Sequence, residues 1–377
     1  MPWRQATVME QRQEFVDLAS HGQLSLSELC RRFGISRQTG YKWLQRWQEQ
    51  GAAGLRDQSS RPRHSPLKTR TVVEEQVLQV RHRHAAWGAR KIAHVLRRDH
   101  GVELAPSTVN SILRRHGCIE RTASQAATAW QRFEHAEPNE LWQMDFKGHF
   151  AAGAARCHPL TVLDDHSRYS LVLDALDCES FEAVQPCLHR AFERYGLPWR
   201  INTDNGPPWR AGGQPATVTR LGLWLIRLGI RLSNSAVAHP QTNGKDERFH
   251  RTFKAEVLGT RHFRDLADAQ QQFDSWRHVY NFERPHQALS MHTPAQRYRC
   301  SVRCMPQTLP PIEYGPDDLV RRVQAGGWIS LHGRDVRLPE SLRGLSIALR
   351  PRPTQDGVFD LYFCHQRLYE INLADTC

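Results

Sequence analysis

Between Pro138 and about residue 300, short apolar runs alternate with amphipathic helical patterns, and this alternation restricts the possible folds more than any other feature. Strands that alternate with helices are typical of α/β domains, in which helices cover an open sheet. The apolar runs are found in "NELWQMDFKGHF", "HPLTVLDDHSRYSLVLDAL", "LPWRINT" and "IRLSN". We therefore expect an α/β core over residues 138–300.

Three acidic residues occupy unusual places in this core. Asp145 lies within an apolar strand, Asp204 directly follows the strand 200–203, and Glu247 lies on the first turn of a helix. An acid at the carboxyl end of a strand lies where open α/β sheets build their sites. Mg²⁺ prefers oxygen ligands, and two such ions about 3.5–4 Å apart can activate an attacking oxygen and stabilise a leaving oxygen. The pattern predicts a site for two Mg²⁺ ions, with Mn²⁺ as a substitute.

The first third of the chain holds most of the excess positive charge. The chain carries 51 Lys and Arg against 39 Asp and Glu, and residues 1–130 contain 21 of the basic and 11 of the acidic side chains. Charge concentrated in this way indicates a polyanion partner, because Lys and Arg displace counterions from nucleic-acid phosphates. A merely soluble basic surface is the alternative.

Residues 1–54 contain the pattern of a helix-turn-helix domain. Ser25 or Ser27 is suited to cap one helix, Gly34 provides a turn, and Ser36 is suited to cap a second helix with Tyr41, Leu44 and Trp47. An ordinary three-helix bundle is the alternative. Three polar side chains of the second helix are expected to face a DNA major groove, namely Arg37, Gln38 and Lys42.

A second helical set is predicted at residues 71–119, after a basic linker at 55–70. Arg61 and Arg63 of that linker are expected to enter a minor groove, although a plain tether is also possible. Pro106 opens the last helix, with Ser107 or Thr108 at its cap, and Val109, Ile112 and Leu113 as its buried stripe. The exposed face of this second helix-turn-helix domain carries two candidate DNA contacts, Arg114 and Arg115.

The remaining segments are less informative. Residues 120–137 read as a linker, and the short strands and turns of residues 305–377 predict a small β-barrel. The nine cysteines have no repeated spacing and are interpreted as reduced thiols, and Cys300 and Cys304 lack a second pair for a zinc site. No apolar run is long enough to cross a membrane, so we expect a cytoplasmic protein without a membrane partner.

Four segments of the core resemble the integrase core of the DDE transposases of bacterial insertion sequences, which are relatives of retroviral integrases. The segments are "LWQMDFKG", "INTDNGPPW", "HPQTNGKDERFHRTFKAEVL" and "YNFERPHQALSMHTPAQRY". The resemblance implies a ribonuclease-H-like fold with Asp145, Asp204 and Glu247 as catalytic, metal-binding acids. Asp164 and Asp246 are the alternatives if one assignment is wrong, although Asp164 and Asp165 are readily explained as turn formers.

The resemblance also implies a function. Such a protein binds the terminal inverted repeats of its element, cleaves phosphodiesters with metal-activated water and joins the 3′-hydroxyl ends to target DNA. Its partners would be double-stranded DNA, as transposon ends and target, and at least one further copy of itself. We expect it in the bacterial cytoplasm, on the nucleoid when bound to DNA. A nuclease without strand transfer and a DNA-binding repressor derived from an inactive transposase are the alternatives.

The helix that begins near Glu247 carries further candidates for DNA contact. Lys245 and Arg248 are expected along the phosphate path. Lys254 lies seven positions after Glu247, two turns along the same helical face, and the resemblance implies that it touches DNA near the cut. A solvated helix face is the alternative for all three basic residues.

Overall fold

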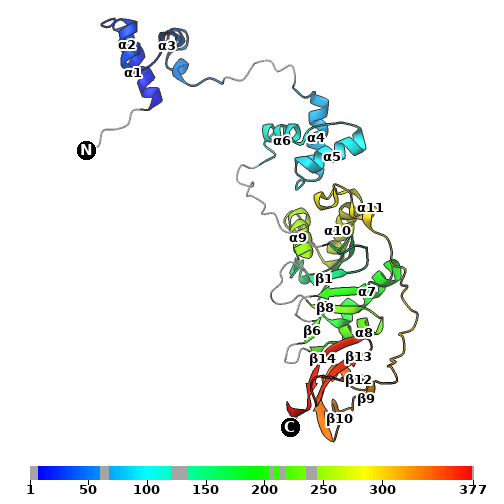
Figure 1. The fold of residues 1–377 in the computed structure, drawn as a ribbon. Coiled ribbons are helices and arrows are strands. Elements are labelled where there is room, and N and C mark those ends of the chain that lie inside the picture. The colour runs from blue at the N-terminus through cyan, green and yellow to red at the C-terminus, as the bar shows by residue number, and fades with distance from the viewer. Residues whose placement is uncertain are drawn as a thin grey trace. The chain divides into compact units, whose positions relative to one another are not determined.

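The structure is a computed structural model that describes residues 7–59, 68–119, 134–203, 208–211, 217–234 and 244–375 (Figure 1). The chain divides into two compact units, Met1–Thr69 and Arg70–Cys377. Each unit is described by itself.

The first unit is a small helical domain with the expected capping residues. It contains α1 (Val8–Ser20), α2 (Leu26–Arg32), α3 (Arg37–Gln50) and a 3₁₀ turn at Gly51–Leu55. Ser25 and Ser36 cap α2 and α3, because each side chain accepts a hydrogen bond from a backbone N–H of the first turn. Six buried side chains form its core: Phe15, Val16, Leu29, Cys30, Trp43 and Leu55.

Two details of α3 differ from the sequence reading. Its buried positions are Gly40 and Trp43, whereas Tyr41 is 64% exposed. Gly40 lets the helices approach closely, since a Cβ atom there would lie 2.6 Å from Cys30 Sγ. The helix is therefore rotated relative to the expected stripe of Tyr41, Leu44 and Trp47.

The second unit begins with three helices, α4 (Thr71–Arg83), α5 (Ala89–His100) and α6 (Pro106–Arg115). Pro106 is the first residue of α6, as expected. The expected cap at Ser107 or Thr108 is wrong, because the N-cap position is Ala105 and no side chain caps the helix. Val109, Ile112 and Leu113 are buried together with seven other apolar side chains, among them Trp87, so the predicted stripe is confirmed.

A mixed sheet forms the centre of the second unit. Its strands are β1 (Trp142–Phe146), β2 (Phe150–Ala152), β3 (Ala155–Asp164), β4 (Ser170–Leu176), β5 (Arg200–Thr203) and β8 (Arg231–Asn234). The order is β2-β3-β1-β5-β8, and β4 also pairs with β3. β3 is antiparallel to β1 and β4, whereas β1, β5 and β8 run parallel. A short pair, β6 (Arg210–Ala211) and β7 (Thr217–Val218), lies outside this sheet.

Helices cover both faces of the sheet. α7 (Phe181–Tyr195) and α8 (Arg220–Arg227) pack on one face, around the buried Trp142. α9 (Gly244–Phe253) and α10 (Leu266–His278) pack on the other face, around Leu163 and Leu173. Each of these two helices continues into a π-helical segment, Lys254–Leu258 and Val279–Glu283, and the short α11 (Pro294–Arg297) follows. The predicted α/β core is therefore confirmed.

The C-terminal segment forms two sheets. One contains β14 (Gln366–Asn372), β13 (Val358–Phe363), β12 (Ser346–Pro351) and β9 (Leu319–Arg322), and the other pairs β10 (Trp328–Leu331) with β11 (Arg334–Arg337). Their apolar faces share one cluster with Leu223 and Ile226 of α8, which docks this domain on the core. The pairings among the described strands close no barrel, so the expected β-barrel is not confirmed.

Candidate active site

Asp145 is held near the carboxyl end of β1, rather than in the middle of the strand. Trp142 and Met144 of β1 are buried on the face covered by α7 and α8, whereas Asp145 is on the face of α9 and its side chain is 32% exposed. Alternation along the strand explains this difference, because successive side chains point to opposite faces of a sheet. Asp145 lies opposite Thr161 of β3, whose hydroxyl donates a hydrogen bond of 2.9 Å to the Asp145 backbone carbonyl.

The register of α9 decides which of its acids face the sheet. Asp246, Phe249, His250 and Phe253 are buried, at the spacing of one helical face, whereas Glu247 is exposed. Asp246 is only 2% exposed. The helix therefore turns Asp246 inward and Glu247 outward.

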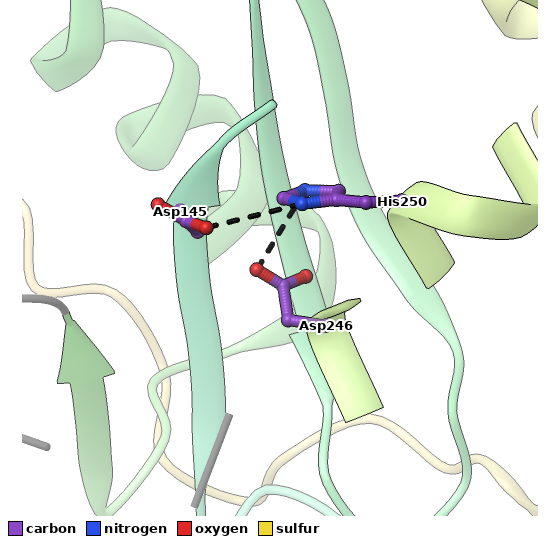
Figure 2. A group of neighbouring side chains, drawn as sticks. All are labelled: Asp145, Asp246 and His250. Carbon is purple, nitrogen blue, oxygen red and sulfur yellow. Dashed lines mark ion pairs between the residues drawn. The ribbon is translucent and has the colours of Figure 1, made fainter. Parts of the chain in front are cut away.

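Asp145, Asp246 and His250 form the one group of three potential metal-binding side chains that the described residues contain. Their ligand atoms all lie within 4.8 Å of one another. Figure 2 shows the Asp145 carboxylate on β1 pointing toward the His250 ring and the Asp246 carboxylate on α9. His250 Nδ1 lies 3.9 Å from Asp145 Oδ2, and His250 Nε2 lies 3.7 Å from Asp246 Oδ2. The Thr161 hydroxyl lies 2.9 Å from His250 Nε2.

Burial controls the charges in this group. It raises the pKa of the Asp246 carboxyl well above its ordinary value, and the neighbouring Asp145 raises it further. Burial also lowers the pKa of the His250 imidazole to about 3, and Lys147 contributes to this shift. Asp246 Oδ2 is buried without a hydrogen-bond partner. Carboxylate oxygens and a neutral imidazole are donors that suit a divalent cation, which would also supply the missing partner of Asp246.

The other two predicted acids are placed differently. Asp204 lies outside the described residues, immediately after Thr203 at the end of β5. β5 is parallel to β1, with Gln143 paired with Asn202, so the carboxyl ends of the two strands lie at one edge of the sheet. Glu247 is on the first turn of α9, next to Asp246. The structure thus brings Asp145 together with Asp246 among the candidate acids that it describes.

Asp164 and Asp165 have structural roles. Asp164 is fully buried and accepts hydrogen bonds from the backbone N–H groups of Asn139 (2.7 Å) and Ser167 (2.8 Å). Asp165 accepts one from Gln143 Nε2 (2.8 Å) and forms a buried ion pair with Lys245. These contacts hold the turn between β3 and β4, in line with the interpretation of both acids as turn formers.

The candidate DNA contacts differ in their surroundings. Arg61 and Arg63 lie outside the described residues. Lys245 is mostly buried against Asp165, and Arg115 Nη1 lies 3.2 Å from Glu74 Oε1, so DNA binding by either would compete with an ion pair. Lys254 is exposed at the first residue of a π-helical segment, where the α-helical period ends. The remaining candidates are exposed: Arg37, Gln38, Lys42, Arg114 and Arg248.

The sequence analysis named Asp246 only as an alternative acid, did not name His250, and expected Tyr41 to share a helical face with Leu44 and Trp47. Asp246 lies three residues before Phe249 and seven before Phe253, and this helical spacing could have placed it on the buried face of the helix. Tyr41 lies among the exposed residues of α3, next to Lys42. Its exposure follows from the close contact at Gly40, which has no simple signal in the sequence.

Comparison with protein families gives matches along most of the chain. Two models described as an integrase core domain match residues 135–240 and 228–294. A helix-turn-helix domain matches residues 11–63, and a homeodomain-like domain matches residues 39–113. The C-terminal domain of the IS481 family transposases matches residues 318–376. No helix in the described part of the chain is both long and apolar enough to cross a membrane.

Individual relatives agree with these matches. The chain is 27% identical to the insertion element IS407 uncharacterized 31.7 kDa protein of Burkholderia multivorans, over 60% of this chain and 80% of that protein. It is 33% identical to the insertion element IS476 uncharacterized 39.2 kDa protein of Xanthomonas euvesicatoria, over 42% of this chain and 44% of that protein. A chain in the cryo-EM structure of the simian T-cell lymphotropic virus intasome aligns with 78% of this chain and 99% of its own length, at 16% identity and a TM-score of 0.36.

Helix-turn-helix domains, an integrase core and an insertion-sequence C-terminal domain follow one another in this order along the sequence. The relatives in Burkholderia and Xanthomonas are themselves proteins of insertion elements. In this order of domains the chain is similar to transposases of the insertion-sequence type with an integrase-like core.

Proposed function

We propose that the chain is a DNA transposase that binds the terminal inverted repeats of its element, cleaves phosphodiesters there and joins the 3′-hydroxyl ends to target DNA. One observation carries the proposal: within the integrase core, Asp145 at the end of β1 faces the acidic first turn of α9. Acids from a strand and a helix that are about a hundred residues apart in sequence have no packing reason to meet in a core. The strand order and directions of the sheet also support the ribonuclease-H-like fold.

The proposed ligands of two Mg²⁺ ions are Asp145, Asp204 and Glu247, and Mn²⁺ is expected to substitute. The closeness of Asp145 to the acidic first turn of α9 supports a cation at this edge of the sheet. Such ions, when bound, would polarise the phosphodiester and activate the attacking oxygen. Glu247 is preferred to Asp246 as the third acid because its exposed carboxylate can reach an ion that also touches DNA.

The chain's own residues orient the acid on β1. The Thr161 hydroxyl contacts both the Asp145 carbonyl and His250 Nε2, and the ring of His250 lies against the Asp145 carboxylate. These contacts are proposed to limit the movement of Asp145, because in-line displacement requires ligands that are held in position. The exposed Arg248 and Lys254 on the same helical segment are proposed to bind the phosphates of double-stranded DNA.

The two helix-turn-helix domains are proposed to bind the element's ends. The first would contact one segment of the terminal repeat through the basic linker and Arg37, Gln38 and Lys42, and the second would contact the next segment through Arg114. Joining two ends to a target requires two active sites, so the active form is proposed to be at least a dimer on DNA. The expected location is the bacterial cytoplasm, on the nucleoid when the protein is bound.

A cleavage and joining assay on the element's own ends tests this function. Parent protein with Mg²⁺ should cut the end and transfer a pre-cut 3′-hydroxyl end to target DNA, and chelation or Asp145→Asn should abolish both products. Hydrolysis without joining would instead identify a nuclease. Specific binding to the ends without any cleavage by the parent would identify a repressor.

A further inference from the structure

We propose that a cavity at the opposite edge of the sheet from Asp145 binds a segment of single-stranded DNA. The cavity has a volume of about 710 Å³, within the range of ligand sites. The inference rests on the proposed function in one respect, namely that the negatively charged polymer bound in the cavity is DNA. The residues that line the cavity are His135, Glu140, Trp199, Arg200, Gly229, Arg231 and His365.

Trp199 provides a rigid, open ring at this cavity. Its side chain is 58% exposed, which is unusual for the largest apolar side chain in a well-packed core domain. The guanidinium of Arg303 lies 4.5 Å from the centre of the ring and supports it. Arg303 is itself fixed by hydrogen bonds to the backbone carbonyls of Leu228 (3.1 Å) and Gly229 (2.9 Å). A ring held in this way is suited to stack with a nucleic-acid base.

Two arginines beside this ring have no acidic partner. Arg200 and Arg231 are the first residues of β5 and β8, and they are paired directly across the two parallel strands. Both are exposed, and neither forms an ion pair with any acid in the described part of the chain. Like charges that face each other across two strands destabilise a sheet. A bound phosphate would remove that repulsion, because Arg matches the geometry of phosphate oxygens.

The rest of the wall keeps the cavity positive and gives it shape. Glu140 is its one acid, and its Oε2 lies 3.5 Å from Nδ1 of His135, which is part of the same wall. His365 comes from the C-terminal domain, and the neighbouring Gln366 fixes that domain to β8 by accepting a hydrogen bond of 3.2 Å from the Leu232 N–H. The cavity is thus built from four separate segments of the chain.

The position of the cavity separates it from the cleavage site. Arg200 begins β5 and Thr203 ends it, so about 10 Å of strand lies between the cavity and the edge that carries the candidate acids. A nucleotide in the cavity is therefore not the one that is cut. In a duplex, each base is stacked between the neighbouring bases. A ring such as Trp199 can therefore stack only on a base that has left the duplex.

Photocrosslinking tests the site directly. A short oligothymidylate carrying 5-iodouracil is irradiated with the full-length protein in the presence of a chelator, and the crosslinked peptide is identified by mass spectrometry. We expect a crosslink at Trp199 with the single strand and none with the same sequence in a duplex. Absence of a crosslink at Trp199, or equal crosslinking by the duplex, would overturn the proposal.

Affinity measurements on variants give a second readout. Trp199→Ala should weaken binding of the oligothymidylate by about five- to a hundredfold, the range for one stacked base. Arg200→Ala with Arg231→Ala should reduce the slope of log affinity against log salt by about 1.4, as expected for two phosphates of a single strand. Trp199→Phe should retain most of the affinity, and Trp328→Ala, a change at a 39% exposed tryptophan outside the cavity, should have no effect. Parental affinity and slope in both cavity variants would reject the site.

These measurements are independent of catalysis. Because they contain no divalent ion, they can succeed even if the cleavage and joining assay fails, which would reject the proposed function alone. Active transposition with no crosslink at Trp199 would reject only the cavity site.

Discussion

Replacement of Asp246 by leucine should stabilise the core in the absence of metal. Asp246 is 2% exposed, its Oδ2 has no hydrogen-bond partner, and its Oδ1 lies 3.4 Å from the Thr161 hydroxyl, which is a weak contact. A buried polar group without a partner costs about 1–3 kcal/mol of stability, and leucine has a similar volume without that cost. We therefore expect the free energy of unfolding of the core to rise by about 1–3 kcal/mol.

Calorimetry with a chelator present measures this change. Each kcal/mol should raise the melting temperature of a core of this size by about 2–4 °C. Glu247→Gln is the matched control one residue further along α9, and it should change stability by less than about 0.5 kcal/mol because the side chain is exposed. The activities should show the opposite pattern, since Glu247→Gln is expected to abolish Mg²⁺-dependent cleavage while Asp246→Leu retains it.

The result that refutes this reasoning is equally specific. If Asp246→Leu removes cleavage while Glu247→Gln leaves it intact, Asp246 is the third metal ligand. If Asp246→Leu lowers the melting temperature in the chelator, the carboxyl is stabilised by contacts that burial and the missing hydrogen bond do not explain.

Three further changes test other parts of the structure. Asp165→Asn should destabilise the core by about 3–5 kcal/mol, because it leaves the mostly buried Lys245 without its ion-pair partner. Denaturant unfolding should show that the double variant with Lys245→Met recovers part of the lost free energy of unfolding. Equal stability of Asp165→Asn and the parent would show that the pair is solvated. Gly40→Val should destabilise the first unit by about 1–3 kcal/mol, since its Cβ would lie 2.6 Å from Cys30 Sγ, and a thermal melt that matches the parent would contradict the close packing of α3. Tyr41→Ala should leave folding unchanged, because Tyr41 is 64% exposed. In a gel-shift assay, Tyr41→Ala and Arg37→Ala should each weaken the binding free energy for the terminal repeat, relative to unrelated duplex, by about 1–3 kcal/mol. Equal loss on both DNA sequences would limit these residues to phosphate contact.

Much of the fold could be predicted from local patterns. Ser36 was correctly predicted as a helix cap, and Ser25 was one of two candidates for the other, because the capping hydrogen bond depends only on residues within one helical turn. The strand at residues 200–203 also followed from its short apolar pattern. Such features depend only on residues that are close in sequence, so they can be predicted from the sequence alone.

Features that depend on packing between distant segments could not be predicted in this way. The rotation of α3 follows from the contact between Gly40 and Cys30, which belong to different helices. The ion pair between Asp165 and Lys245 joins residues 80 positions apart, and it gives Lys245 a partner other than DNA phosphate. The closure of strands into a barrel likewise depends on pairings between distant strands, and the described pairings leave two separate sheets.

The placement of Asp246 and Glu247 on α9 gives a physical reason to assign them different roles. Successive residues of an α-helix point about 100° apart, so a helix with Asp246 against the sheet turns Glu247 toward solvent. An ion that acts on DNA must keep coordination positions open to a phosphate oxygen, and a carboxylate that is 2% exposed cannot lie on that open side. His250 lies 3.9 Å from Asp145 and 3.7 Å from Asp246 between α9 and the sheet, whereas Glu247 is exposed to solvent. Burial therefore favours Glu247 as the metal ligand, even though Asp246 is the acid in contact with the group around Asp145.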